Sequence, residues 1–273
     1  MRKLEFCKVV ASGNDFVIIE NNYPPGTRRY PLLAKNICGR KFGIGADGLL
    51  ILEKSKIADI KMRIFNADGT EAEMCGNGAR CVAFYTRSTL HAPRSTLKIE
   101  TKAGIAESQV RADRVKIKLT QARDYQPRIA IKINGRELRI YSINTGVPHA
   151  VIFVEGVDTI DVSNIGRQIR YYECFAPQGT NVNFVEAINK NTIKVRTYER
   201  GVEDETLACG TGAAASAIVY SLQSTVYSQK NKINVITQGG ETLKVYFDRE
   251  GNKVDNLCLE GKVKIVYRGE YYV

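Results

Sequence analysis

The sequence predicts an α/β (α+β) protein of two duplicated, pseudo-symmetric domains, each a mostly antiparallel sheet wrapped around one central helix. Three observations predict it. Four sequence landmarks recur in the same order, 131–134 residues apart. Short runs rich in β-branched residues are separated by Gly, Asn and Asp turns. One small, apolar helical segment follows each of two Cys-Gly-x-Gly-Ala motifs, which indicates that it is buried.

Each landmark in the first half has a counterpart in the second. They are, in order, a strand with a glycine turn and an apolar run, a glycine turn before a second apolar run, an alternating strand, and a cysteine motif. The pairs are 4–20 with 138–155, 45–53 with 179–186, 60–64 with 193–196, and Cys75–Ala79 with Cys209–Ala213. The unit that repeats is far longer than a solenoid repeat, so we interpret it as a domain duplication. The expected domains are 1–119 and 120–261, with central helices at 79–85 and 213–222.

Composition favours a cytoplasmic protein that binds a small molecule. The chain has 273 residues, a net charge of +11 and no apolar run of transmembrane length, and its first residues lack a signal-peptide pattern. The basic residues are scattered rather than grouped with stacking aromatics, so neither nucleic acid nor membrane is an expected partner. Seven cysteines, an odd number, indicate reduced thiols, and the lack of a Cys-x-x-Cys pair argues against zinc.

Cys75 and Cys209 are the candidate chemical groups because each comes just before an expected helix. The glycines that follow let backbone N–H groups approach a ligand, and a helix N-terminus attracts anions. The same helix end favours the thiolate form of a cysteine. Finding this motif at equivalent positions of two copies predicts a thiol on each side of a cleft between the domains.

Two facing thiols suit inversion at a carbon next to a carboxylate. One thiolate removes the α-proton from one face while the other thiol delivers a proton to the opposite face. The two helix ends would hold the carboxylate and stabilise the charge that develops on it. The sequence thus predicts a cofactor-independent amino-acid epimerase.

The chain resembles the diaminopimelate epimerase family over nearly its whole length. Segments 65–81 and 198–213 are similar to the two signature regions of that family, and Ser12–Phe16, Gly43–Gly48 and Pro148-His149 are similar to further landmarks. The resemblance implies interconversion of LL- and meso-2,6-diaminopimelate, in lysine and peptidoglycan precursor synthesis, without pyridoxal phosphate or metal. It also implies that 262–273 return to complete the first domain. Val147 and Gly48 depart from residues that some members carry, Asn and Gln.

The resemblance also implies roles for individual residues. Cys75 and Cys209 match the catalytic cysteines, and His149 and Glu199 match side chains that partner those thiols. The positions that match the subsite for the far end of the substrate are Asn14, Asn66, Asn183 and Arg200. The positions that match the backbone cradle for the near carboxylate are Gly76, Asn77, Gly210 and Thr211.

Three alternatives stay open. The first is a racemase of proline, hydroxyproline or another amino acid that uses the same two thiols. The second is an isomerase on this scaffold without thiol chemistry, and the third is a non-catalytic thiol or metal-binding module. We expect the other five cysteines, at 7, 38, 81, 174 and 258, to serve in packing. A homodimer is a candidate assembly.

Overall fold

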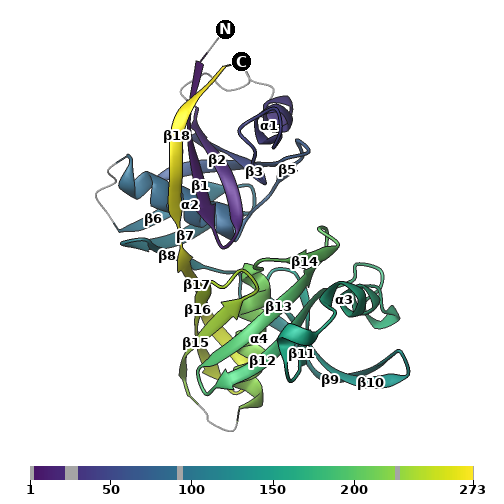
Figure 1. Ribbon diagram of the computed structural model, residues 1–273. Coiled ribbons are helices and arrows are strands. Elements are labelled where there is room, and N and C mark those ends of the chain that lie inside the picture. Colours follow the sequence, from purple (N-terminus) through teal and green to yellow (C-terminus); the bar gives the residue numbers. More distant parts are fainter. Residues whose placement is uncertain (1–2, 22–29, 91–94, 225–227, 273) are drawn as a thin grey trace. The chain divides into compact units, whose positions relative to one another are not determined.

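The chain folds into two compact units. The computed structural model describes residues 3–21, 30–90, 95–224 and 228–272 (Figure 1). Unit 1 comprises Met1–Ile117 and Gly261–Val273, and unit 2 comprises Lys118–Glu260. The domain boundaries expected from the sequence stay a prediction.

In its described residues, unit 1 is a mixed sheet with two helices. Its strands are β1 (Lys3–Ala11), β2 (Asn14–Glu20), β3 (Gly48–Glu53), β4 (Ile60–Asn66), β5 (Glu71–Ala72), β6 (Thr96–Thr101), β7 (Gly104–Arg111), β8 (Arg114–Lys118) and β18 (Lys264–Tyr272). Its helices are α1 (Tyr30–Cys38) and α2 (Gly76–Ser88). The strands pair in the order β18-β1-β2-β3-β4-β6-β7-β8, with β5 also on β4. Only β2–β3 and β4–β6 are parallel in this series.

Unit 2 repeats this arrangement. Its strands are β9 (Arg123–Ile133), β10 (Arg136–Asn144), β11 (Pro148–Phe153), β12 (Asn181–Asn189), β13 (Thr192–Glu199), β14 (Asp204–Thr206), β15 (Lys230–Thr237), β16 (Thr242–Glu250) and β17 (Lys253–Lys262). Its helices are α3 (Val162–Arg170), α4 (Gly210–Gln223) and the 3-10 turns η1 (Val157–Thr159) and η2 (Glu173–Phe175). The order is β9-β10-β11-β12-β13-β15-β16-β17, with β14 on β13. The parallel pairs, β11–β12 and β13–β15, fall at the same places as in unit 1, so the predicted duplication is confirmed.

The chain's last strand takes the same place in unit 1 that β9 takes in unit 2. β18 pairs antiparallel with β1 from Lys3↔Tyr272 to Val10↔Lys264. β9 pairs with β10, the counterpart of β1, in the same way. In unit 2 this strand directly precedes its partner in the sequence, whereas in unit 1 it comes from the other end of the chain.

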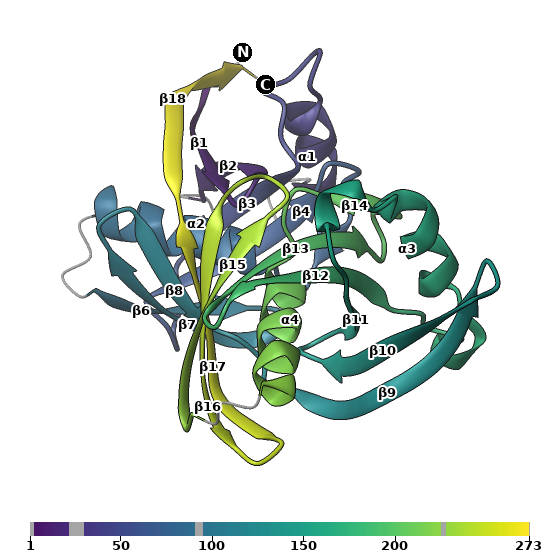
Figure 2. The ribbon, with the colours of Figure 1, turned by 60° about the horizontal axis from the view of Figure 1, so that its bottom comes forward.

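In each unit one helix lies inside the curve of the sheet. α2 contacts β1 to β4, β6 and β7, and α4 contacts β10 to β13, β15 and β16 (Figure 2). The residues of α4 from Gly212 to Val219 are all buried, and most are small, so the sheet can close around the helix. The predicted central helices are therefore confirmed. They begin at Gly76 and Gly210, three residues earlier than expected, because each cysteine acts as the helix cap.

A second helix covers the other face of each sheet, and the sequence analysis did not predict it. α1 packs its Ala34 and Ile37 against Leu49 and Ile51 of β3, and α3 packs in the same way against β12 and β13. Leu50 faces the other way, towards Gly78 of α2. β3 is buried on both faces, which explains its unbroken apolar run from Leu49 to Leu52.

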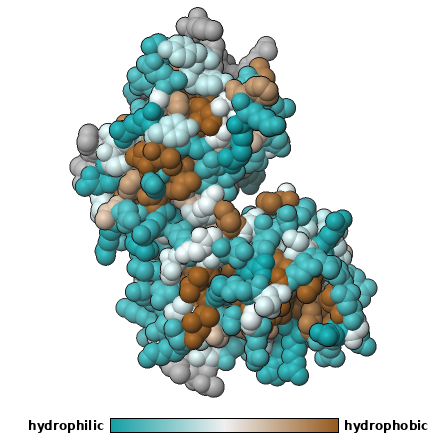
Figure 3. Space-filling model, viewed as in Figure 1, coloured by the Kyte–Doolittle hydropathy of each residue, from teal (hydrophilic) through white to brown (hydrophobic). Residues whose placement is uncertain are grey.

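On the face drawn in Figure 3, hydrophilic residues cover most of each unit and hydrophobic residues form separate patches. Among the described residues, no helix is both long and apolar enough to cross a membrane. One sequence-based expectation was wrong. Cys174 is exposed rather than packed, because it lies on the short turn η2, which presents no buried face of its own.

Candidate functional site

Cys75 is the N-terminal cap of α2. Its backbone is extended (φ −142°, ψ 120°), and its sulfur accepts a hydrogen bond from Gly78 N at 3.4 Å. The thiol therefore lies at the helix end where backbone N–H groups have no partner within the helix. A β-carbon placed on Gly76 would meet nothing within 4 Å, so there is open space beside the thiol. An anion could bind there.

Two predicted residues, Asn14 and Asn77, meet beside this helix end. Asn77 Nδ2 donates to Asn14 Oδ1 at 2.5 Å, and Asn14 Nδ2 donates to Asp47 Oδ2 at 3.2 Å. Arg80, which the sequence analysis did not single out, is 0 % exposed and donates to Asn77 Oδ1 at 2.5 Å and to Ser12 Oγ at 2.7 Å. A buried, permanently charged guanidinium thus fixes the amide of Asn77.

Asn66 faces Gly48 across the β3–β4 ladder, next to Asp47, which accepts a hydrogen bond from Asn14. Asn66 is exposed at the end of β4, and its Nδ2 donates to Thr70 Oγ1 at 2.9 Å across the turn that leads to β5. The structure therefore brings Asn14 and Asn77 into direct contact and places Asn66 beside the residue that binds Asn14.

Cys209 caps α4 as Cys75 caps α2. Its backbone is extended (φ −115°, ψ 113°), and Gly212 N donates to its sulfur at 3.4 Å. Thr211 Oγ1 lies 3.5 Å from the same sulfur, and the carbonyl of Thr211 accepts a hydrogen bond from Thr145 Oγ1 at 3.0 Å. Burial, and then the negative charge of Glu199, raise the pKa of the Cys209 thiol to about 12. Cys209 is therefore a protonated thiol at neutral pH, and the expectation that the helix start would favour its thiolate was wrong, because burial outweighs the helix end.

Glu199 stands at the end of β13, where burial raises the pKa of its carboxyl group. Thr206 Oγ1 donates to Glu199 Oε2 at 3.1 Å from the neighbouring strand β14. Because the charge of Glu199 acts on Cys209, the structure brings these two predicted residues together. Thr206 is a residue that the sequence analysis missed.

His149 and Asn183 form a buried pair. Both are 0 % exposed, and Asn183 Nδ2 lies 3.2 Å from His149 Nδ1 and 3.0 Å from the carbonyl of Ala150. Asn183 Oδ1 accepts a hydrogen bond from Thr197 Oγ1 at 3.0 Å. Burial, and then the charge of Arg200, lower the pKa of His149 to about 3, so the ring is neutral at neutral pH.

The pair lies against the start of α4. A β-carbon placed on Gly212 would come within 2.3 Å of Asn183 Oδ1, so only glycine fits at this position of the helix. A β-carbon placed on Gly210 would likewise come within 2.9 Å of Leu259 Cδ2. The backbone N–H of Arg200 donates a hydrogen bond to Asn181 Oδ1 at 2.9 Å, and its Nη1 donates one to the carbonyl of Gln178 at 3.4 Å.

The arrangement of each unit can bind an anion and present a thiol to it. Among the described residues, no group of three or more His, Cys, Asp or Glu side chains is placed to hold a metal ion. Of the supporting residues that the sequence analysis missed, Ser12 and Thr145 had a usable signal. They occupy equivalent positions in the two copies, 133 residues apart, in the turn before the second strand of the repeat.

A sequence model described as diaminopimelate epimerase matches residues 6–123 and 141–266. A curated relative of that name from Aquifex aeolicus is 41% identical over 280 residues, covering 97% of each chain. Another, from Methanocella arvoryzae, is 41% identical over 284 residues, covering 99% of this chain and 97% of its own.

Solved structures of more distant proteins share the fold. A PhzF-family phenazine biosynthesis protein from Bacillus anthracis superposes with a TM-score of 0.79 at 18% identity, covering 100% of both chains. A hydroxyproline epimerase from Agrobacterium vitis superposes with a TM-score of 0.69 at 15% identity, covering 98% of this chain and 92% of its own. At these identities the likeness concerns the fold alone.

Proposed function

The chain belongs to the diaminopimelate epimerase family, and from this premise we propose that it interconverts LL- and meso-2,6-diaminopimelate with Cys75 and Cys209 as its acid–base pair. The observation that carries the proposal is the matched placement of the two cysteines. Each caps the central helix of its unit, in the same extended conformation and with the same N–H···S contact. A duplicated fold that keeps a thiol at both helix starts is suited to a reaction that needs two such groups.

The proposed reaction moves one proton off and one proton onto the same carbon. A thiolate takes the α-proton, and the electron pair of the C–H bond passes into the adjacent carboxylate. The thiol on the opposite face then donates its proton to the carbon, which inverts its configuration. The reaction therefore requires the two thiols to face the carbon from opposite sides. No pyridoxal phosphate or metal takes part in this route.

The near carboxylate is bound, in this proposal, by the helix starts. Gly76 and Asn77 at α2, with Gly210 and Thr211 at α4, provide N–H groups and the positive end of the helix dipole. These groups stabilise the enolate-like charge more than the ground state, which is what speeds the proton transfer.

The remaining predicted residues take supporting roles. Glu199 acts on the protonation of Cys209, and His149 shapes the start of α4 through Asn183. The far end of the substrate is assigned to Asn14, Asn66, Asn183 and Arg200. Arg200 suits this task because a guanidinium can bind a carboxylate with two hydrogen bonds.

We also propose a cytoplasmic location and a homodimer. A two-thiol reaction needs reduced cysteines, and the cytoplasm keeps thiols reduced. Large apolar side chains on β18, at Val266, Tyr267 and Tyr272, are 44–52% exposed and offer a surface that a second copy would cover. Cell fractionation and light scattering, respectively, test these two points. A nucleic-acid or membrane partner is not part of the proposal.

The proposed function is tested by incubating reduced, metal-free protein with LL-diaminopimelate and no added cofactor. We expect the meso isomer to form, as measured by chiral chromatography, and L-proline to remain unchanged under the same conditions. Turnover of proline or hydroxyproline instead would keep the two-thiol chemistry but overturn the substrate. Absence of turnover with every amino acid tried would overturn the catalytic proposal.

A further inference from the structure

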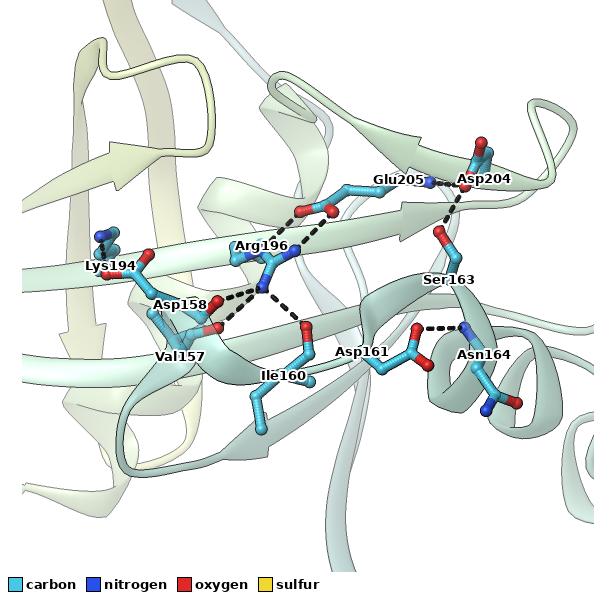
Figure 4. A network of polar contacts seen from close by, with 10 residues as sticks. All are labelled: Val157, Asp158, Ile160, Asp161, Ser163, Asn164, Lys194, Arg196, Asp204 and Glu205. Carbon is cyan, nitrogen blue, oxygen red and sulfur yellow. Dashed lines mark hydrogen bonds and ion pairs between the residues drawn. The ribbon is translucent and has the colours of Figure 1, made fainter.

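An arginine–glutamate pair occurs at equivalent places in both units. In unit 1, Arg63 Nε lies 2.7 Å from Glu71 Oε1, and Arg63 Nη2 lies 3.1 Å from Glu71 Oε2. In unit 2, Arg196 Nε and Nη2 each lie 2.7 Å from one oxygen of Glu205 (Figure 4). The two arginines are 133 residues apart and the two glutamates 134, which is the spacing of the duplication. Both pairs are therefore copies of one feature.

The two pairs have the same geometry on the sheet. Glu71 faces Phe65 across the β4–β5 ladder, and Glu205 faces Tyr198 across the β13–β14 ladder. In each unit the arginine stands two residues before that facing residue, so it lies diagonally opposite the glutamate on the same face. A two-pronged bond between charged groups is stronger and more directional than a single hydrogen bond.

Each pair anchors a very short strand. β5 has two residues and β14 has three, so each is held to its neighbour by few backbone hydrogen bonds. The ion pair adds a side-chain attachment to a segment that would otherwise be weakly fixed. In unit 2 this attachment also holds Thr206, whose hydroxyl donates to Glu199.

The anchored strand leads directly to the thiol. Glu71 comes four residues before Cys75, and Glu205 comes four residues before Cys209. Each cysteine has an extended backbone, and a 3.4 Å contact from a backbone N–H to its sulfur. The place of the sulfur therefore depends on where the short strand before it is fixed.

The two arginines are secured in different ways. Arg196 Nη1 donates to the carbonyls of Val157, Asp158 and Ile160 at 2.8–3.2 Å, and these residues lie in and next to η1 (Figure 4). Arg63 instead stacks on two aromatic rings, with its guanidinium carbon 5.1 Å from the Tyr30 centroid and 5.0 Å from the Phe65 centroid. Each arginine thus ties its glutamate to the body of its own unit.

We propose that Arg63–Glu71 and Arg196–Glu205 are positioning pairs, each of which sets the place of the thiol in its own unit. The proposal rests on the proposed function, since it concerns the alignment of the same two thiols. It differs from a general stabilising role, because each pair acts on one thiol and not on the other. A misplacement of about 1 Å can reduce a rate about 100-fold without a loss of folding.

The test uses Arg196→Lys, which keeps the charge but loses the two-pronged bond, and the matching variant Arg63→Lys. The control is Lys194→Gln, which removes an ion pair with Asp158 from the same strand, β13. We measure the alkylation rates of Cys75 and Cys209 by iodoacetamide in one sample, with mass spectrometry of the peptides. We also measure kcat, KM and the melting temperature of each variant.

We expect Arg196→Lys to change the alkylation rate of Cys209 at least about 3-fold while that of Cys75 stays constant, and Arg63→Lys to do the reverse. We expect kcat to fall roughly 10- to 100-fold with little change in KM. Glu205→Gln should reproduce the effect of Arg196→Lys. It therefore provides the same test if Arg196→Lys does not fold. Equal changes at both cysteines, or a lower melting temperature with unchanged kcat and alkylation, would overturn the proposal. The alkylation measurement needs no turnover, so it stands even if the proposed function fails.

Discussion

The two thiol-bearing helix starts share one backbone arrangement but differ in the charges around them. Both cysteines cap a central helix and accept a hydrogen bond from the third residue on. In α2 the fifth residue after the thiol is Arg80, a fully buried cation, whereas the equivalent residue of α4 is Ala214. Cys209 instead has a carboxylate, Glu199, that raises its pKa.

This difference shows that the two copies have diverged in the charged groups that surround an unchanged backbone. A buried carboxylate next to a thiol favours the protonated form of that thiol, as Glu199 does for Cys209. In this protein the backbones of the two helix starts remain equivalent, whereas the charged side chains outside the Cys-Gly-x-Gly-Ala motif differ between the two units.

The largest expected effect is the loss of either thiol. Cys75→Ala and Cys209→Ala should each lower the rate of epimerisation about 1000-fold, because each removes one of the two proton-transfer groups. The exposed cysteine provides the control, and Cys174→Ala should leave the rate unchanged. Rates are measured by chiral chromatography. Retention of most of the activity by one of the two variants would show that the halves are not equally needed.

Removal of the buried cation comes next in size. Arg80→Met leaves the oxygen of the buried Asn77 amide without its charged donor, so the free energy of unfolding should fall by roughly 3 kcal/mol. Arg87→Met, in the exposed last turn of the same helix, should change it by less than about 0.5 kcal/mol. Urea unfolding measures both. Equal effects of the two variants would contradict the role given to Arg80.

We expect the buried His149 of unit 2 to make the stability of the protein depend on pH. Its pKa is about 3 in the folded protein and near 6.5 when unfolded, so the unfolded chain binds a proton first as the pH falls. This residue should therefore remove about 2 kcal/mol of stability between pH 8 and pH 5. Unfolding at both pH values, compared with His149→Gln, isolates this contribution. A variant with the same slope as wild type would show that His149 does not titrate in this way.

The smallest expected effect concerns Glu199. Glu199→Gln removes a negative charge that raises the pKa of Cys209, so that pKa should fall. The midpoint of the pH dependence of Cys209 alkylation measures it, with Cys75 in the same sample as the reference. If both midpoints move together, the charge of Glu199 is not specific to its own unit.

The sequence was enough to predict the features that the duplication repeats. The repeated landmarks indicated two copies of one fold, and the Cys-Gly-x-Gly-Ala motifs placed a thiol at the start of each central helix. Both features follow from local patterns, a spacing and a short motif, which can be recognised without information on contacts between distant residues.

The features that it missed depend on contacts between distant segments. α1 and α3 are short helices stabilised by packing on the sheet, which a local pattern does not reveal. Arg80 was passed over because a single arginine in a helix is ordinarily exposed, and its burial depends on Ser12, 68 residues away. Arg63–Glu71 and Arg196–Glu205 could have been found by aligning the two copies, because both members recur at the spacing of the duplication.

The central claim, that two thiols act on opposite faces of one carbon, is tested most directly by the fate of deuterium at early times. LL-diaminopimelate is incubated with the protein in D2O, and substrate and product are separated and examined by mass spectrometry. The account predicts one deuterium in each meso molecule and almost none in the remaining LL substrate, because the base that removes the proton is not the group that supplies the new one. Equal deuterium in substrate and product from the start would indicate a single base and contradict the account.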